Sequence, residues 1–189
     1  MKNLILSMNV SLDGFVAGLK GEMDWIHADE QLFNYIVKLT DQADTAMYGR
    51  VTYEMMNAYW PTAQDQPNPS THDINHSIWY NQVNKIVISN KMKDVHLDKT
   101  QFIGEDIIHQ VQQLKQQPGK NILMFGSPSA AHTLMQYNLI DDYWLFINPV
   151  LLGNGIPLFD MIKDKMNLKL IESQVFTSGV IEVHYEKQP

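Results

Sequence analysis

The chain has 189 residues, of which 44% are hydrophobic and 19% charged, a composition typical of a single soluble domain with a well-buried core. Its formal net charge of −7 disfavours a nucleic acid or an anionic membrane surface as a partner. The absence of cysteine excludes disulfides, Cys-ligated zinc and thiol catalysis. We therefore expect a cytoplasmic protein with one domain, residues 1–189, and a small-molecule substrate.

Short β-rich runs alternate with helical patterns along the chain. Strands are predicted at residues 4–10, 45–48, 85–89, 121–125 and 143–152, and helices at residues 29–39, 52–59, 107–114 and 129–137. Residues 64–73 are rich in Pro, Asn, Gln and Asp and are predicted as a loop. A hairpin is expected around residues 177–179. The pattern predicts an α/β fold with a mainly parallel central sheet, helices on both faces and a C-terminal antiparallel hairpin.

Three strand ends point to a ligand, because open α/β sheets bind ligands beyond the carboxyl ends of their strands. The runs that follow the strands are Gly49-Arg50-Val51-Thr52, Ser89-Asn90 and Gly126-Ser127-Pro128-Ser129, and the first and third open helices. Ser127 suits an N-cap and Pro128 a first helical turn, so this helix start is expected to present free N–H groups to an anion.

Arg50 is the only arginine in the chain and directly follows a glycine. A guanidinium binds phosphate in a bidentate manner, and Gly49 and Gly126 would let a ligand approach the backbone closely. Together these features predict a cradle for a dinucleotide with an extra phosphate, although each glycine junction alone is also explained by ordinary turn chemistry. His72 and His76 have the spacing of a metal pair but no third ligand, so no metal site is predicted.

Several segments resemble a known family. GRVTYE, the strand end ISN and FGSPSAAHTL resemble cofactor-binding segments of the dihydrofolate reductase-like superfamily. SLDGFVAG and LIDDYWLFINPVLLGNGIPLF are similar to the reductase domain of riboflavin-biosynthesis enzymes, the RibD C-terminal family. The resemblance covers nearly the whole chain and implies a dihydrofolate reductase-like fold that binds NADPH. The family and the apolar segment 143–152 also favour a homodimer.

The resemblance implies a role for each matching position. Arg50 would contact the 2′-phosphate of NADPH, Val10 and Ala17 would offer backbone groups to the nicotinamide amide, and residues 18–25 would cover the ring. The cofactor-binding set implied in this way is Val10, Ala17, Gly18, Gly49, Arg50, Val51, Thr52, Ser89, Asn90, Gly126, Ser127, Pro128, Ser129 and Ala130. In the RibD C-terminal family two glycines are usual where this chain has Gly126 and Ser127.

Dihydrofolate reductases place one carboxylate in the first helix to bind the pterin and assist its protonation. Because Trp25 matches their loop-end tryptophan, the catalytic acid would be Glu30, with Asp29 as second choice. A carboxylate buried beside a ring can have its pKa raised towards neutrality, whereas an exposed acid in a first helical turn only complements the helix dipole. Trp25 and Asp13 are the implied substrate-binding residues, although Asp13 with Gly14 is more typical of a turn or bulge.

The expected function is NADPH-dependent reduction of a pyrimidine- or pteridine-type heterocycle, similar to that of 5-amino-6-(5-phosphoribosylamino)uracil reductase. Riboflavin-pathway members carry arginines for the ribose phosphate of their substrate, and this chain has none beyond Arg50. The alternatives are a true dihydrofolate reductase and an NADPH-binding module without turnover.

Overall fold

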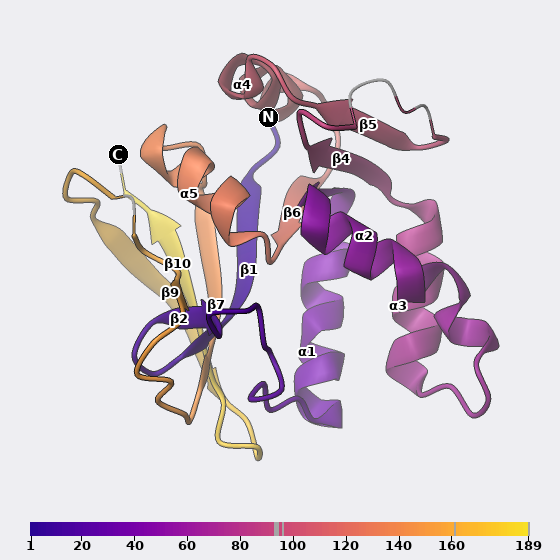
Figure 1. Cartoon of the computed structure of the whole chain (residues 1–189), viewed down its shortest axis with the longest axis vertical. Coiled ribbons are helices and arrows are strands. Elements are labelled where there is room, and N and C mark those ends of the chain that lie inside the picture. The colour runs from indigo at the N-terminus through magenta and orange to yellow at the C-terminus, as the bar shows by residue number, and fades with distance from the viewer. Residues whose placement is uncertain (93–94, 96, 161, 189) are drawn as a thin grey trace.

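A twisted eight-stranded sheet forms the centre of the molecule, with strand order β5-β4-β3-β6-β1-β7-β10-β9 (Figure 1). The computed structural model describes residues 1–92, 95, 97–160 and 162–188. Its strands are β1 Leu4–Ser11, β2 Phe15–Ala17, β3 Ala43–Gly49, β4 Asn84–Ile88, β5 Thr100–Ile103, β6 Asn121–Phe125, β7 Asp142–Asn148, β8 Ile156–Pro157, β9 Leu168–Val175 and β10 Ile181–Lys187. The helices are α1 Glu30–Asp41, α2 Arg50–Tyr59, the 3₁₀ helix η1 Trp60–Asp65, α3 Thr71–Gln82, α4 Ile107–Gln116 and α5 Pro128–Gln136.

The predicted fold class is confirmed by the strand directions. The six strands from β5 to β7 pair in parallel, and β10 and β9 continue the sheet as an antiparallel hairpin. β2 and β8 form a separate two-stranded sheet. The carboxyl ends of the parallel strands therefore meet at one edge, where a ligand site is expected.

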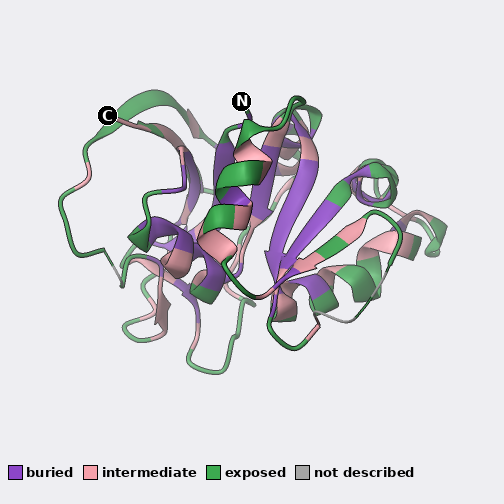
Figure 2. Ribbon diagram, turned by 90° about the horizontal axis from the view of Figure 1, so that it is seen from above, coloured by how far each residue is buried: buried purple, intermediate pink, exposed green. Residues whose placement is uncertain are grey.

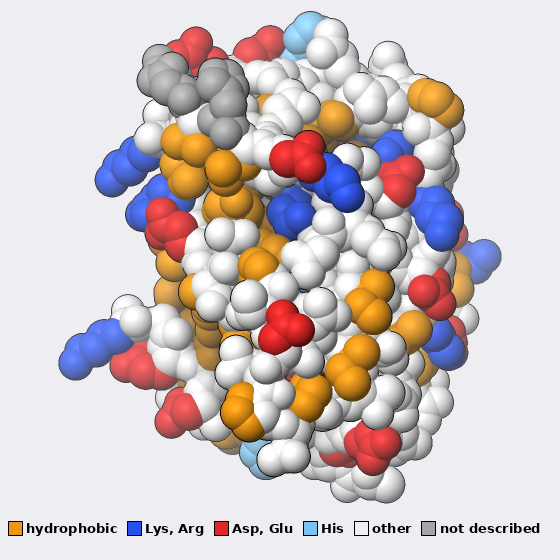
Figure 3. All heavy atoms as spheres, turned by 90° about the vertical axis from the view of Figure 1, so that its right-hand side faces the viewer, with side chains coloured by type: hydrophobic (Ala, Val, Ile, Leu, Met, Phe, Trp, Pro, Cys, Tyr) orange, Lys and Arg blue, Asp and Glu red, His pale blue; other side chains and the backbone are white. Residues whose placement is uncertain are grey.

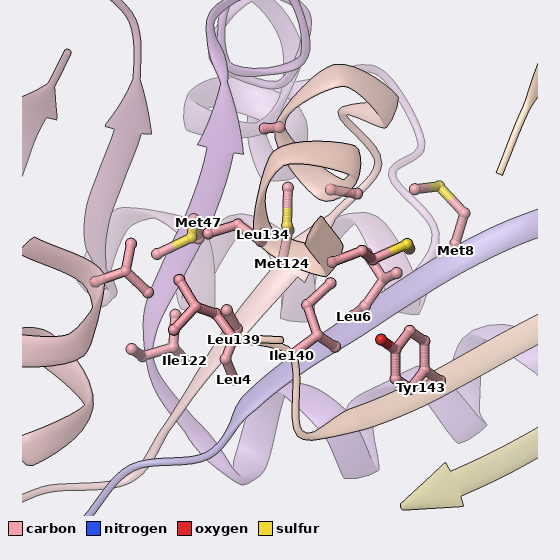
Figure 4. Packing of buried hydrophobic residues seen from close by; sticks show 14 of the residues in the cluster. Leu4, Leu6, Met8, Met47, Ile122, Met124, Leu134, Leu139, Ile140 and Tyr143 are labelled. Atoms are coloured by element: carbon pink, nitrogen blue, oxygen red, sulfur yellow. The ribbon is translucent and has the colours of Figure 1, made fainter. Parts of the chain in front are cut away.

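Side chains alternate between the two faces of each strand, and this alternation divides the core. Leu4, Leu6 and Met8 of β1 pack with residues of α4 and α5 on one face (Figure 4). Ile5, between them, packs with Leu32 and other residues of α1 on the opposite face. A third cluster joins β3 and β4 to α2 and α3. Helices thus cover both faces, and the buried residues concentrate in the central strands (Figure 2).

The predicted loop at residues 64–73 is wrong at both ends, because η1 ends at Asp65 and α3 begins at Thr71. A capping box starts α3, in which the Asp73 N–H donates to Ser70 Oγ at 3.1 Å and the Ser70 N–H donates to Asp73 Oδ2 at 2.9 Å. The Ser-x-x-Asp spacing is a sequence signal for this helix start. The buried residues of α3 include the polar His76 and Ser77, however, so its apolar residues do not recur with a helical period.

The strand predicted at residues 143–152 ends earlier, at Asn148, and Pro149 follows, which lacks an N–H for a sheet ladder. β7 lies between β1 and β10 inside the sheet. Its apolar side chains are therefore explained by the core, and they give no support to a subunit interface at this strand. The homodimer stays a prediction. The short strands β2, β5 and β8 were not predicted.

Glu182 of β10 is a fully buried carboxyl group beneath α1. Tyr35 donates a hydrogen bond to its Oε2 at 3.0 Å, and Oε1 has no partner among the described residues. Burial raises the pKa of Glu182 from its ordinary value of 4.5 to about 7. The folded state thus holds this proton more tightly than the unfolded chain does.

This buried group predicts a pH dependence of stability. Because the folded pKa of Glu182 is raised, its contribution is fully present below about pH 4.5 and is lost as the pH rises through 7. Glu182→Gln should remove this loss and leave the variant more stable than the parent by roughly 1–2 kcal/mol at pH 8, with little difference at pH 4.5. Urea unfolding at the two pH values measures this. An unchanged pH dependence in the variant would show that Glu182 does not titrate in the folded protein.

Candidate cofactor and substrate site

A stretch of β1 at the carboxyl edge of the sheet lacks a neighbouring strand on one side. β6 pairs with β1 only as far as Ser7, opposite Phe125, whereas β7 accompanies β1 to Ser11. The edge of residues 8–11 that faces β6 is therefore left without a strand partner. Val10, predicted to offer backbone groups to the nicotinamide amide, lies in this segment, but its N–H and C=O face β7, as do those of Leu4 and Leu12, and the backbone groups of Asn9 face the open edge. The Gly126–Ser127 corner that opens α5 lies where the pairing stops.

The helix starts of α2 and α5 lie against each other. The Gly49 N–H donates to Ser127 Oγ at 2.7 Å, and a Cβ added at Gly49 would lie 3.2 Å from the Ser127 side chain. A Cβ added at Gly126 would lie 3.4 Å from Thr52 Cγ2. The first and third strand ends predicted from the sequence are thus brought together. Ala130 is buried and faces Gly49, while Val51 and Ser129 are exposed.

Arg50 is the first residue of α2, and its side chain is 35% exposed. Its guanidinium forms an ion pair with Glu54, one turn along the helix, at 2.7 Å. An exposed pair of this kind is weak, so Arg50 stays available to a stronger anion. The sequence did not reveal that Glu54 competes for it.

The second strand end, Ser89-Asn90, lies between the ends of β3 and β5 in the sheet order. The Ser89 N–H donates to Ile103 O at 2.8 Å, and a Cβ at Gly104 would lie 2.6 Å from Asn90 Oδ1. Gly104 is therefore needed for the close approach of these two strand ends. Ser89 is buried and Asn90 exposed, so Asn90 is the more accessible of the two to a ligand.

Ser127 is the N-cap residue of α5 and Pro128 opens its first turn, as predicted, but the serine side chain does not form the capping hydrogen bond. The backbone of Ser127 is left-handed, with φ of +63°. Gly126 before it also has positive φ, +55°. The serine hydroxyl accepts from Gly49 instead, which compensates for part of the cost of a left-handed residue other than glycine.

Two substitutions separate these opposing effects. Ser127→Ala keeps the strained backbone and leaves the buried Gly49 N–H unpaired, at a cost of about 1–3 kcal/mol in unfolding free energy. Ser127→Gly loses the same bond but relieves roughly 1 kcal/mol of strain, so it should be the milder change. Denaturant unfolding of both variants measures the difference. If alanine is tolerated better than glycine, the left-handed strain at Ser127 is absent.

The segment 18–25, predicted to cover the nicotinamide ring, folds on itself. The Gly18 N–H donates to Glu22 O at 2.9 Å, and Trp25 Nε1 donates to the same carbonyl oxygen at 3.1 Å. The indole N–H is thus engaged, and Trp25 as a whole is half-buried. Ala17 lies in β2, buried, and is paired with Ile156 of β8.

The two predicted catalytic acids are not enclosed. Asp29 is the N-cap of α1: its Oδ1 accepts from the Leu32 N–H at 2.7 Å, and its Oδ2 accepts from Thr177 Oγ1 and the Ser178 N–H, each at 3.0 Å. The hydrogen bond from Leu32, with those from Thr177 and Ser178, lowers the pKa of Asp29. A proton donor needs the opposite shift, so the hydrogen bonds of Asp29 do not favour its predicted role as the acid. Glu30 is exposed and lacks the enclosure required of a neutral acid.

Asp13 holds two loops together. Its carboxylate accepts from Ser11 Oγ at 2.7 Å, from the Leu152 N–H at 3.1 Å and from the Gly153 N–H at 2.7 Å. The bond from Ser11 is the main reason that the pKa of Asp13 is lowered. These bonds explain Asp13 as a turn residue, and its prediction as a substrate contact is not supported.

His72 and His76 pack in an aromatic cluster on α3. His72 stacks on Phe33 with ring centroids 4.1 Å apart, and the ring centroids of His76 and Trp60 are also 4.1 Å apart. Burial lowers the pKa of His76 to about 3, so its ring is neutral. Within residues 1–92, 95, 97–160 and 162–188, no three side chains of the metal-binding types come together. On the side of the molecule that carries α3, the acidic and basic side chains of the described residues are scattered among one another (Figure 3).

A family model described as the RibD C-terminal domain matches residues 2–181. The chain belongs to the RibD C-terminal family. Its relatives in Bacillus subtilis include the uncharacterised proteins YyaP, 33% identical over 186 residues, and YwjB, 27% identical over 185 residues. These alignments cover 97% of this chain in both cases, and 94% of YyaP and 97% of YwjB.

Solved structures support the dihydrofolate reductase-like fold of this RibD C-terminal domain. A crystal structure from Shewanella sp. PV-4, described as a candidate riboflavin biosynthesis protein, has a TM-score of 0.75 at 23% identity over the full length of both chains. A deaminase/5-amino-6-(5-phosphoribosylamino)uracil reductase of Thermotoga maritima has a TM-score of 0.70 at 13% identity, and the match covers 99% of this chain and 57% of that one. In the described part of this RibD C-terminal domain, no helix is both long and apolar enough to cross a membrane.

Proposed function

We propose that this RibD C-terminal domain is an NADPH-dependent reductase that transfers a hydride to a pyrimidine- or pteridine-type heterocycle. The observation that carries the proposal is the open backbone edge of residues 8–11 beside two adjoining helix starts, with the only arginine of the chain at one of them. Strand backbone suits a carboxamide, helix N-termini suit a pyrophosphate, and a guanidinium suits an added phosphate.

NADPH would supply the hydride, and the chain would supply position and charge. Arg50, with Ser89 and Asn90, would hold the 2′-phosphate. Thr52 and the main chain at 126–130 would hold the pyrophosphate, where the missing side chains of Gly49 and Gly126 permit a close approach. Val10 and Ala17 would orient the nicotinamide, and residues 18–25 would limit access of water to its ring.

The charges near the start of α1 favour a substrate without a ribose phosphate. A shallow, open hollow at the start of α1 is lined by Asp29, Glu30, Gln31, Asn34 and Thr177, which include two carboxylates and no cation. Seven of the lysines already donate hydrogen bonds elsewhere: Lys2, Lys38, Lys85, Lys99, Lys115, Lys120 and Lys187. A phosphate near these carboxylates would be repelled, so a neutral ring is the better substrate.

A true dihydrofolate reductase is a second candidate, favoured because Glu30 lines this hollow at the start of the first helix. NADPH oxidation with dihydrofolate, with the phosphoribosylaminouracil intermediate and with its dephosphorylated form separates the two functions. We expect the dephosphorylated aminouracil to be reduced fastest. Absence of NADPH oxidation with all three, together with absence of NADPH binding, would refute the proposal.

The proton is expected to come from water or from the substrate, because Glu30 is exposed and Asp29 accepts three hydrogen bonds. Glu30→Gln should therefore retain hydride transfer within about threefold, whereas loss of a working general acid typically costs about a hundredfold or more. Single-turnover rates with NADPH and the preferred substrate measure this. A hundredfold loss with unchanged NADPH affinity would restore Glu30 as the acid.

A further inference from the structure

Asn148, the last residue of β7, joins three segments of the candidate site. It is fully buried. Its Nδ2 donates to Phe146 O at 3.0 Å and to Asn9 Oδ1 at 3.1 Å, and its Oδ1 accepts from the His27 N–H at 2.8 Å. The side chain therefore links β7 to β1 and to the segment that leads into α1.

These partners fix the orientation of two amide groups. Phe146 O can only accept and the His27 N–H can only donate, so the Asn148 amide has a single satisfactory orientation. Its Nδ2 then faces Asn9, which has to present its oxygen. The Nδ2 group of Asn9 is consequently turned away from Asn148, and rotation of the Asn9 amide would place two N–H₂ groups against each other.

The Nδ2 group of Asn9 is open to a ligand. It has no hydrogen-bond partner among the described residues, and the nitrogen atom is not fully buried. Asn9 lies in the unpaired 8–11 segment of β1 and is half-buried. Because side chains alternate along β1 and Ile5 packs against α1, Asn9 lies on the α1 face of the sheet. A fixed N–H donor thus stands at the strand edge on the side where α1 begins.

We infer that Asn9 is a specificity-determining residue that donates a hydrogen bond to a ring carbonyl oxygen of the substrate, and that Asn148 is the positioning residue that fixes this donor. The inference rests on the proposed reductase function. It assigns the substrate to lactam-type rings, such as uracils and oxo-pteridines, rather than to rings that bear an amino group at that position. A donor held by a buried neighbour discriminates well, since an amino group opposite it leaves both donors unpaired.

Uracil and cytosine are suitable probes because they have nearly the same size. They differ at C4, which bears a carbonyl in uracil and an amino group in cytosine, and at the adjacent N3, which carries a proton only in uracil. Their affinities for the full chain saturated with NADP⁺ are measured by calorimetry or by ligand-observed NMR. The unmodified chain is expected to prefer uracil by about tenfold or more. Asn9→Asp, which offers an acceptor of the same shape, should abolish or reverse the preference for uracil. Asn9→Leu should weaken the binding of uracil without strengthening the binding of cytosine.

Asn148→Ala tests the positioning role, because a merely structural residue would not change the ratio of the two affinities. It should lower the preference for uracil towards unity, and thermal unfolding shows whether the variant is folded. If it is not, the Asn9 variants still decide the question.

NADPH affinity, measured for every variant, separates failure of this inference from failure of the proposed function. Two outcomes would overturn the inference alone, provided that NADPH binds normally. One is an unchanged ratio of uracil to cytosine affinity in Asn9→Asp, and the other is that neither probe binds to the unmodified chain. A large loss of NADPH affinity in Asn9→Asp would also overturn it, because it would assign Asn9 to the nicotinamide. Absence of NADPH binding by the unmodified chain would instead refute the reductase function.

Discussion

Gly126→Val is expected to weaken NADPH binding by at least about a hundredfold, which corresponds to 2.7 kcal/mol or more. Gly126 has φ of +55°, a conformation that a β-branched residue rarely adopts. A side chain here would begin 3.4 Å from Thr52 Cγ2 and would lie between the starts of α2 and α5. The valine would therefore occupy the space through which the pyrophosphate approaches the main-chain N–H groups.

Gly153→Val is the matched control. Gly153 also has positive φ, +71°, but nothing lies within 4 Å of an added Cβ, and it belongs to the loop held by Asp13. This variant carries a similar backbone penalty without obstructing the cradle, so it should lose stability and keep NADPH affinity. Calorimetry under conditions where both proteins are folded measures the contrast. A folded Gly126→Val protein with normal NADPH affinity would show that the cofactor does not approach this corner.

Arg50→Ala is expected to weaken NADPH binding by roughly tenfold to a hundredfold and to leave NADH binding nearly unchanged. Charge-assisted hydrogen bonds contribute about 1.5–3 kcal/mol, and only NADPH carries the 2′-phosphate that would form them. The effect should shrink at high salt, because the Arg50 side chain is 35% exposed and its charge is partly screened.

Glu54→Gln removes the other partner of this ion pair and should have the opposite effect on NADPH affinity. Glu54 competes for Arg50 in the free protein. An exposed ion pair one helical turn apart contributes about 0.3–0.5 kcal/mol to stability, so its removal should raise the affinity for NADPH by roughly twofold. Opposite signs for Arg50→Ala and Glu54→Gln with NADPH, and no change for either with NADH, would assign the 2′-phosphate to Arg50. Equal losses for both cofactors in Arg50→Ala would contradict the assignment.

The parts of the site that sequence could predict are those carried by local patterns. A strand followed by glycine and a helix recurs at Gly49 and Gly126, and parallel strands necessarily bring such ends to one edge. Their approach within a hydrogen bond, from Gly49 to Ser127, confirms that the two corners are adjacent. The exact use of the Ser127 hydroxyl could not be predicted, because it depends on a left-handed backbone that serine rarely adopts.

The contacts that the sequence did not reveal join distant residues or depend on burial. Asn148 and Asn9 are 139 positions apart, and neither stands in a recognisable motif with the other. Asp29 and Glu30 were proposed as acids on the assumption of enclosure, which is a tertiary property. In the same way α3 was missed, because its buried face includes His76 and Ser77 and so lacks an apolar period.

Amide hydrogen exchange with and without NADPH, read by mass spectrometry, tests the location of the cofactor most directly. We predict slower exchange at the unpaired segment 8–11 and at the starts of α2 and α5, residues 49–53 and 126–131, because a bound cofactor would cover these N–H groups. NADH should protect the α2 start less, since it lacks the phosphate assigned to Arg50. Protection confined to other parts of the chain, or none at saturating NADPH, would contradict the proposed cofactor site.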